Sequence, residues 1–289
     1  MRDTGYRILA DGVTTSNDTW ATGLANHDLI IGPTGGGKTR GYVLPNLLST
    51  QESCIVADSK GTLRRQVGGI LERRGFRVME LDFTDLLHSP WGYNPLRFIR
   101  WDEQRGCWNE QDIITVAAAL VPVEDKTQPF WEYAARNLLE ALISYTLECL
   151  PAEEHDLTSV VRLFAEAETG VLDELMRELC TIDPDGFVAM RWRSLQTCRR
   201  ADKMYGSVLG ILSQKISNFS FAGARELFKN PNQIDFAAIS HTPTAVFVRV
   251  SDNDFSLNNL TSLFYTQALQ ALIAEADKQP DNRLQIPVR

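Results

Sequence analysis

Short apolar runs alternate with amphipathic stretches in the first third of the chain. Each run has the length of a strand, and a segment with helical spacing separates the second run from the third. The runs are residues 26–32 (NHDLIIG), 53–58 (SCIVAD) and 77–82 (RVMELD). The helical segment, 61–75, places its apolar side chains on one face, namely Leu63, Val67, Ile70 and Leu71. Strands that alternate with helices predict a parallel α/β sheet.

Helical periodicity dominates the chain from about residue 108 to about residue 230. Apolar positions recur there every three to four residues in the stretches 111–122, 130–151, 156–168 and 170–180. We find no convincing strand in this range, so we expect an all-helical block. Asp156 and Asp183 stand where helices are expected to begin.

Sheet character returns near the C-terminus. Residues 244–250 (TAVFVRV) predict a strand, and residues 257–277 predict a long helix. The last residues, 284–289 (LQIPVR), look like the beginning of one more strand. The α/β part is therefore expected to be split in sequence by the helical block.

A glycine-rich stretch carries the strongest chemical signal. Residues 32–39 (GPTGGGKT) match the pattern GxxxxGK[ST] in full, between an apolar run and a predicted helix. Glycine loses more backbone freedom on folding than other residues, and phosphate binding would offset that loss, because successive N–H groups can turn toward an anion. The alternative interpretation is a glycine-rich turn without a ligand. Pro45 is expected to end or kink the following helix.

The pattern assigns a role to each position. Lys38 is expected to reach the β- and γ-phosphates, and the Thr39 hydroxyl is expected to bind Mg²⁺. These two residues are the predicted catalytic residues. The predicted nucleotide-binding residues are Gly32, Pro33, Thr34, Gly35, Gly36, Gly37, Lys38, Thr39 and Arg40.

The sequence favours ATP over GTP and leaves the role of Asp58 open. Residues 58–61 fit DxxG, but a GTPase also needs an NKxD-type motif, and the chain has none. Asp58 could approach Mg²⁺ through water, or it could cap the next helix. Neither Asp58 nor Asp82 precedes a second acid, so the Walker B acids are expected beyond 284–289. We therefore expect weak or absent ATPase activity from this chain.

Composition and charge exclude several other classes of site. The formal net charge of −8 argues against coating by nucleic acid through bulk charge. The five cysteines are dispersed and form no CxxC pair, which argues against a disulfide framework and a zinc site. We find neither a signal peptide nor an apolar stretch long enough to span a membrane. The basic cluster 190–203 is either a phosphate-contacting or partner-binding patch or an ion-paired helix face.

Several motifs, in order along the chain, resemble one family. They are 32–48 (GPTGGGKTRGYVLPNLL), 53–83, 93–99 (YNPLRFI), 130–142 (FWEYAARNLLEAL) and 251–272. Together they resemble the type IV secretion coupling proteins, the TraG/TraD-like ATPases of conjugative DNA transfer. Ser59 and Thr62 depart from the family's D-P-K-G-E motif, in which proline and glutamate stand at these positions.

The resemblance implies a RecA-like P-loop ATPase domain with an all-α insertion domain. The expected parts are 1–105 (first part of the ATPase domain), 106–235 (insertion) and 236–289 (return to the ATPase domain, truncated before Walker B). It also implies a hexamer at the cytoplasmic face of the bacterial cell membrane. That ring would use ATP to couple single-stranded DNA and its relaxase to the type IV secretion channel. This chain is expected to be a soluble, largely monomeric fragment without the family's membrane helices.

Two alternative functions share the phosphate-binding loop. The first is another hexameric DNA-translocating ATPase. The second is a nucleotide-gated module that recruits a protein substrate through the helical block and hydrolyses nothing.

Overall fold

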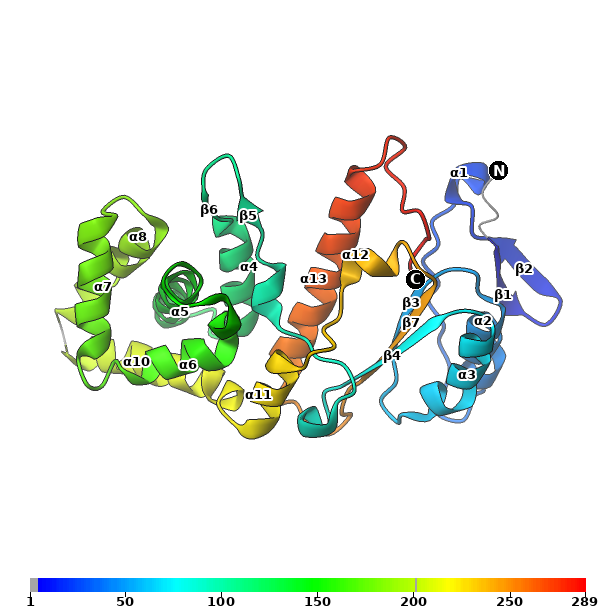
Figure 1. Cartoon of the computed structure of the whole chain (residues 1–289). Coiled ribbons are helices and arrows are strands. Elements are labelled where there is room, and N and C mark those ends of the chain that lie inside the picture. Colours follow the sequence, from blue (N-terminus) through cyan, green and yellow to red (C-terminus); the bar gives the residue numbers. More distant parts are fainter. Residues whose placement is uncertain (1–4, 201) are drawn as a thin grey trace. The chain divides into compact units, whose positions relative to one another are not determined.

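The computed structural model describes residues 5–200 and 202–289, which form two compact units (Figure 1). The chain leaves the first unit after Thr84 and returns to it twice. The first unit comprises Met1–Thr84, Ile234–Asn253 and Ala268–Arg289. The second comprises Asp85–Gln233 and Asp254–Gln267.

The first unit is built on a parallel three-stranded sheet with the order β3-β7-β4. The strands are β3 (Cys54–Ala57), β7 (Thr244–Arg249) and β4 (Arg77–Asp82). The central strand, β7, is buried over its first five residues and is rich in β-branched and aromatic side chains, as expected for a strand covered on both faces. The strands predicted in 53–58, 77–82 and 244–250 are therefore confirmed.

The last residues of the chain add to the other edge of β3. Val288 forms a parallel bridge with Ser53. The Ile55 N–H donates to the Arg289 carbonyl at 2.9 Å, and the Arg289 N–H donates to the Ser53 carbonyl at 2.9 Å. Residues 284–289 were expected to begin one more strand, and their last residues do pair with the edge of β3.

Helix α3 (Thr62–Arg73) covers one face of this sheet together with α2 (Leu44–Ser49). The core beneath them consists of Leu47, Cys54, Leu63, Val67, Leu71, Phe76, Ala245 and Phe247. Full burial of a leucine contributes about 1.5–3 kcal/mol. Ile70 was expected on the buried face, but it is exposed, because a helix turns by about 100° from one residue to the next and Leu71 takes the inward position.

An N-terminal hairpin packs beside α2. Its strands are β1 (Tyr6–Ala10) and β2 (Val13–Ser16), and α1 (Thr19–Thr22) follows. The Asn46 amide joins the hairpin to α2, since it accepts from the Ile8 N–H and donates to the Ile8 carbonyl, both at 2.8 Å. This side chain pairs with β1 as a neighbouring strand would.

The second unit consists of helices around α5 (Phe130–Cys149), apart from two short strands, β5 (Trp101–Asp102) and β6 (Cys107–Trp108). Figure 1 shows α5 end-on, with α4, α6, α8 and α10 around it. The α-helices are α4 (Glu110–Leu120), α6 (Leu157–Ala165), α7 (Val171–Ile182), α8 (Phe187–Ser194), α9 (Gln196–Arg199), α10 (Asp202–Ile216) and α11 (Ala222–Lys229). Single turns lie at Leu86–His88, Pro95–Phe98, Ala152–Glu154 and Ser217–Phe219.

Two further helices belong wholly or partly to the first unit. Helix α12 (Phe236–Ile239) precedes β7. Helix α13 (Asn258–Asp277) is divided, because its residues up to Gln267 belong to the second unit and its residues from Ala268 to the first. Among the described residues, no helix combines the length and the apolar character that a membrane span requires.

The two predicted helix-start residues behave differently. Asp156 caps α6, where its carboxylate accepts from the Ser159 N–H at 2.9 Å. The prediction for Asp183 is wrong, because this residue follows the last turn of α7 and the next helix begins at Phe187. Gly186 takes the cap position of that helix instead.

Two arginines of the basic cluster 190–203 form ion pairs within the second unit. The Arg191 guanidinium lies 2.6 Å from the buried carboxylate of Glu140. The Arg199 guanidinium pairs with Asp173 and lies over the Trp192 ring, 4.4 Å from its centroid. These two cations therefore stabilise helix packing, which favours the ion-paired interpretation for them.

His241 joins three segments of the first unit. One ring nitrogen lies 3.0 Å from a Glu275 carboxylate oxygen, and the other lies 3.0 Å from the Gln285 side-chain oxygen. Two acceptors favour the doubly protonated ring, so these contacts raise the pKa of His241, with Gln285 the larger cause.

We predict that this contact makes the first unit more stable at mildly acidic pH. Because the folded-state pKa is raised, the stabilisation is complete below the unfolded pKa of about 6.5 and is lost as pH rises through the folded pKa. Urea midpoints at pH 6 and pH 8.5 measure the effect. His241→Gln should flatten this pH dependence, and an unchanged difference between the two midpoints would contradict the assignment.

Candidate nucleotide-binding site

The glycines of the loop at 32–39 adopt backbone conformations that other residues avoid. Gly35 has φ of +78° and Gly37 has φ of +81°. A Cβ added at Gly36 would lie 3.0 Å from the Pro33 carbonyl, which accepts the Gly36 N–H at 3.1 Å. The three glycines are therefore each needed for this tight loop, and residues 33–40 are exposed.

The Lys38 ammonium binds the loop itself. Its Nζ donates to the Gly32 carbonyl at 2.6 Å and to the Pro33 carbonyl at 3.0 Å. The side chain is exposed, so a phosphate oxygen could replace either carbonyl as the acceptor. A charge-assisted bond to phosphate is stronger than one to a neutral carbonyl, which favours that exchange.

The loop opens a helix, as predicted, but Pro45 does not end it. A π-helical turn (Thr39–Val43) leads directly into α2, in which Pro45 is the second residue. The Leu44 N–H donates to the Thr39 carbonyl, five residues back. Proline has no N–H to donate and crowds the carbonyl four residues before it, so the wider turn accommodates the ring and the helix continues to Ser49.

The predicted strand at 26–32 is absent from the described structure. Leu29 is 84% exposed and Ile31 is 85% exposed, and this segment pairs with no strand among the described residues. Apolar residues alone do not make a strand, because its backbone groups need a partner at a sheet edge. The β3 edge is paired with Pro287–Arg289 instead.

Side-chain bonds hold the segment before the loop. The buried Arg7 guanidinium lies 2.8 Å from the Asp28 carboxylate, which also accepts from the Tyr42 hydroxyl at 2.6 Å. Burial opposes ionisation of Asp28, but the bonds from Tyr42 and Arg7 outweigh it and hold the pKa of this carboxyl below its usual value. Residues on both sides of the loop are thus joined through one carboxylate.

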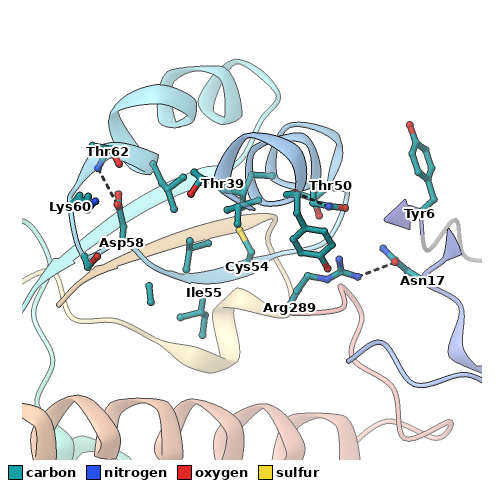
Figure 2. Close-up of a pocket in the computed structure, with 18 residues that line it drawn as sticks. Tyr6, Asn17, Thr39, Thr50, Cys54, Ile55, Asp58, Lys60, Thr62 and Arg289 are labelled. Atoms are coloured by element: carbon teal, nitrogen blue, oxygen red, sulfur yellow. Dashed lines mark hydrogen bonds between the residues drawn. The ribbon is translucent and has the colours of Figure 1, made fainter. Parts of the chain in front are cut away.

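A cavity of about 480 Å³ lies between β3 and the helix that the loop at 32–39 opens (Figure 2). It extends from Asp58 and Lys60 at one end, past Thr39, toward Asn17 and Arg289 at the other. Its floor includes β3 residues Cys54 to Ala57. Burial raises the pKa of the Cys54 thiol to about 12, so this thiol is protonated and unreactive at neutral pH.

Asp58 acts as a helix cap in the described structure. One carboxylate oxygen accepts from the Thr62 N–H and the other from the Arg64 N–H, both at 3.0 Å. The same side chain lines the cavity from the end of β3, and Thr39 lines it from the helix that the loop opens, so the two predicted metal-binding residues share this cavity. Its role toward Mg²⁺ stays a prediction. Among the described residues, no cluster of three or more His, Cys, Asp or Glu side chains has the geometry of a metal site.

The structure brings some of the predicted site residues together and leaves others apart. Thr39 and Asp58 share the cavity, but Lys38 and Arg40 are not among its lining residues. Asp82, the other candidate acid, lies 2.6 Å from the Arg249 guanidinium. Lys60 was not among the predicted site residues, although it stands in the DxxG stretch and keeps the lysine of the family's D-P-K-G-E motif. It lines the same cavity as Thr39 (Figure 2).

A family model described as "Type IV secretory system Conjugative DNA transfer" matches residues 4–288. The chain belongs to this family. A relative in Escherichia coli, the conjugal transfer protein TraG, is 26% identical over 239 residues, which are 79% of this chain and 36% of TraG. The predicted family resemblance is therefore confirmed, and the chain spans only about a third of this relative's length.

The chain is also similar to solved structures of a bacterial conjugative coupling protein. The unbound form of the bacterial conjugative coupling protein TrwBdeltaN70 is 16% identical, with a TM-score of 0.59, over 96% of this chain and 56% of that chain. The plasmid coupling protein TrwB in complex with the GTP analogue GDPNP is 14% identical, with a TM-score of 0.44, over 98% of this chain and 70% of that chain. The first likeness confirms the predicted fold class, a RecA-like P-loop NTPase domain with an all-α domain.

We predict that Asp58→Ala lowers the free energy of unfolding by about 1–3 kcal/mol. The substitution leaves two N–H groups of the first turn of α3 without their acceptors. Asp58→Asn keeps one carbonyl oxygen and should lose less. Urea unfolding of the three proteins measures this, with the exposed Asp252 changed to alanine as the control. Equal stability of Asp58→Ala and wild type would show that the cap is unimportant.

Proposed function

We propose that this chain binds ATP with Mg²⁺ at the loop 32–39, as the nucleotide-binding part of a conjugative DNA-transfer motor. The observation that carries the proposal is the loop itself. Two of its glycines have positive φ, it opens a helix, and it ends in Lys38 and Thr39. Helix N-termini and inward-turned N–H groups bind phosphate in P-loop proteins, and the family acts in conjugative DNA transfer.

The proposed roles follow from the residue chemistry. Lys38 exchanges its two carbonyl acceptors for β- and γ-phosphate oxygens, and it stabilises the negative charge there. The Thr39 hydroxyl supplies an oxygen to Mg²⁺, and Asp58 approaches the same ion through water. The backbone of residues 32–37, together with Arg40, completes the nucleotide contacts. Mg²⁺, when bound, neutralises phosphate charge.

We propose the wider role on the strength of family membership. Residues 1–105 and 236–289 belong to the ATPase domain, and 106–235 form the all-α insertion. A hexamer at the cytoplasmic face of the cell membrane couples single-stranded DNA and its relaxase to the type IV secretion channel. ATP is favoured because the chain lacks a guanine-reading NKxD motif. Turnover by this chain is weak, because neither Asp58 nor Asp82 is followed by a second acid that could activate water.

Calorimetric titration with Mg-ATP tests the proposal. We expect wild type to bind, and Lys38→Ala to weaken binding by at least about tenfold, since a charge-assisted bond is lost. Lys126→Ala is the matched control, because this exposed lysine belongs to the second unit. Mg-GTP, titrated in parallel, should bind less tightly.

The titration separates two clear results. Binding that Lys38→Ala removes and Lys126→Ala leaves intact supports a phosphate site at the loop. If wild type binds no nucleotide, or if Lys38→Ala binds as well as wild type, the proposal is wrong and the glycines serve a turn alone.

A further inference from the structure

The carboxyl ends of β3, β4 and β7 lie at one edge of the sheet, because the three strands are parallel. Ligands of open α/β sheets bind at this edge. Five charged side chains lie at this edge of the sheet or in the loop at 32–39. Whether a cation among them can bind an anion depends on the bonds that it already forms. They are Lys38, Asp58, Lys60, Asp82 and Arg249.

Four of the five already have partners. The Asp58 carboxylate accepts from two N–H groups of α3. Asp82 accepts from the Arg249 guanidinium at 2.6 Å and from the Thr84 N–H at 2.7 Å, which neutralises both charged groups. The Lys38 ammonium binds two loop carbonyls.

Lys60 differs from these groups. In the described part of the chain its side chain forms no ion pair and no hydrogen bond, and it is exposed. A tight turn holds its backbone in place, since the Gly61 N–H donates to the Asp58 carbonyl at 3.1 Å and Gly61 has φ of +61°. A side chain at position 61 would also crowd Arg249, whose Nε lies 3.1 Å from the site of a Cβ.

The cavity connects Lys60 to the loop. Lys60 and Thr39 both line it, from the end of β3 and from the helix that the loop opens (Figure 2). Thr39 directly follows Lys38 in the chain, so the cavity that Lys60 lines reaches the residue next to Lys38. Arg40 is also exposed, but it is not among the cavity residues.

We propose that Lys60 is a second cation of the nucleotide site and binds the outer phosphates of a nucleoside triphosphate opposite Lys38. The inference rests on the proposed function, since it assumes a triphosphate on the loop. A triphosphate carries more charge than one lysine neutralises. Lys60 has no carbonyl to release before it binds, whereas Lys38 has two.

The test measures the affinity of Mg-ATP, Mg-ADP and AMP by calorimetry at low salt. The proteins are wild type, Lys60→Ala, Lys60→Arg, Lys38→Ala and the control Lys126→Ala. We expect Lys60→Ala to weaken Mg-ATP by about 5- to 20-fold, because one charge-assisted contact is lost. AMP should change by less than about twofold, because it lacks the outer phosphates, and Lys60→Arg should keep most of the affinity.

The outcomes distinguish this inference from the proposed function. Loss of Mg-ATP affinity in Lys60→Ala, with AMP unchanged, supports it. Wild-type affinity in Lys60→Ala, with binding lost in Lys38→Ala, overturns the inference and leaves the proposed function standing. An equal loss of affinity for all three nucleotides in Lys60→Ala also overturns the inference, because the effect then does not depend on the outer phosphates. Absence of binding by wild type contradicts both.

Discussion

The pairing of β7 between β3 and β4 is the constraint on which the first unit depends. β3 and β4 do not pair with each other, and each reaches the sheet only through a strand that arrives after most of the second unit has been traversed. The five buried residues at the start of β7 supply the apolar contacts, and parallel pairing fixes which ends share an edge. The positions of Asp58, Asp82 and Arg249 at one edge follow from this pairing, and so does the cavity beside β3.

The elements with strong periodicity could be predicted from the sequence. The strands in 53–58, 77–82 and 244–250 are apolar runs bounded by polar residues, and α3 has three of its four expected residues buried. The prediction of a strand at 26–32 was wrong because a strand needs an edge to pair with, and the sequence of one segment does not reveal such an edge. The prediction that Asp183 begins a helix was wrong because α7 extends up to this residue, which ends that helix. The next helix begins after Gly186.

The site was predictable in type but not in arrangement. GxxxxGK[ST] identifies the loop because each position has a chemical reason, yet spacing cannot show that Lys38 binds the loop's own carbonyls. It also cannot show that Asp82 is neutralised by Arg249, which lies far away in sequence. A chain with a net charge of −8 can thus carry a cationic site, because its acids at the sheet edge hold structural bonds while two lysines face the loop and the cavity.

We infer that the glycine loop exists to bind phosphate. Backbone amide NMR of the ¹⁵N-labelled chain, titrated with Mg-ATP, tests it directly, because each glycine N–H reports its own hydrogen-bond partner. We expect the largest shifts at Gly35, Gly36, Gly37, Lys38 and Thr39. Shifts confined to other segments, or none at saturating Mg-ATP, would contradict it.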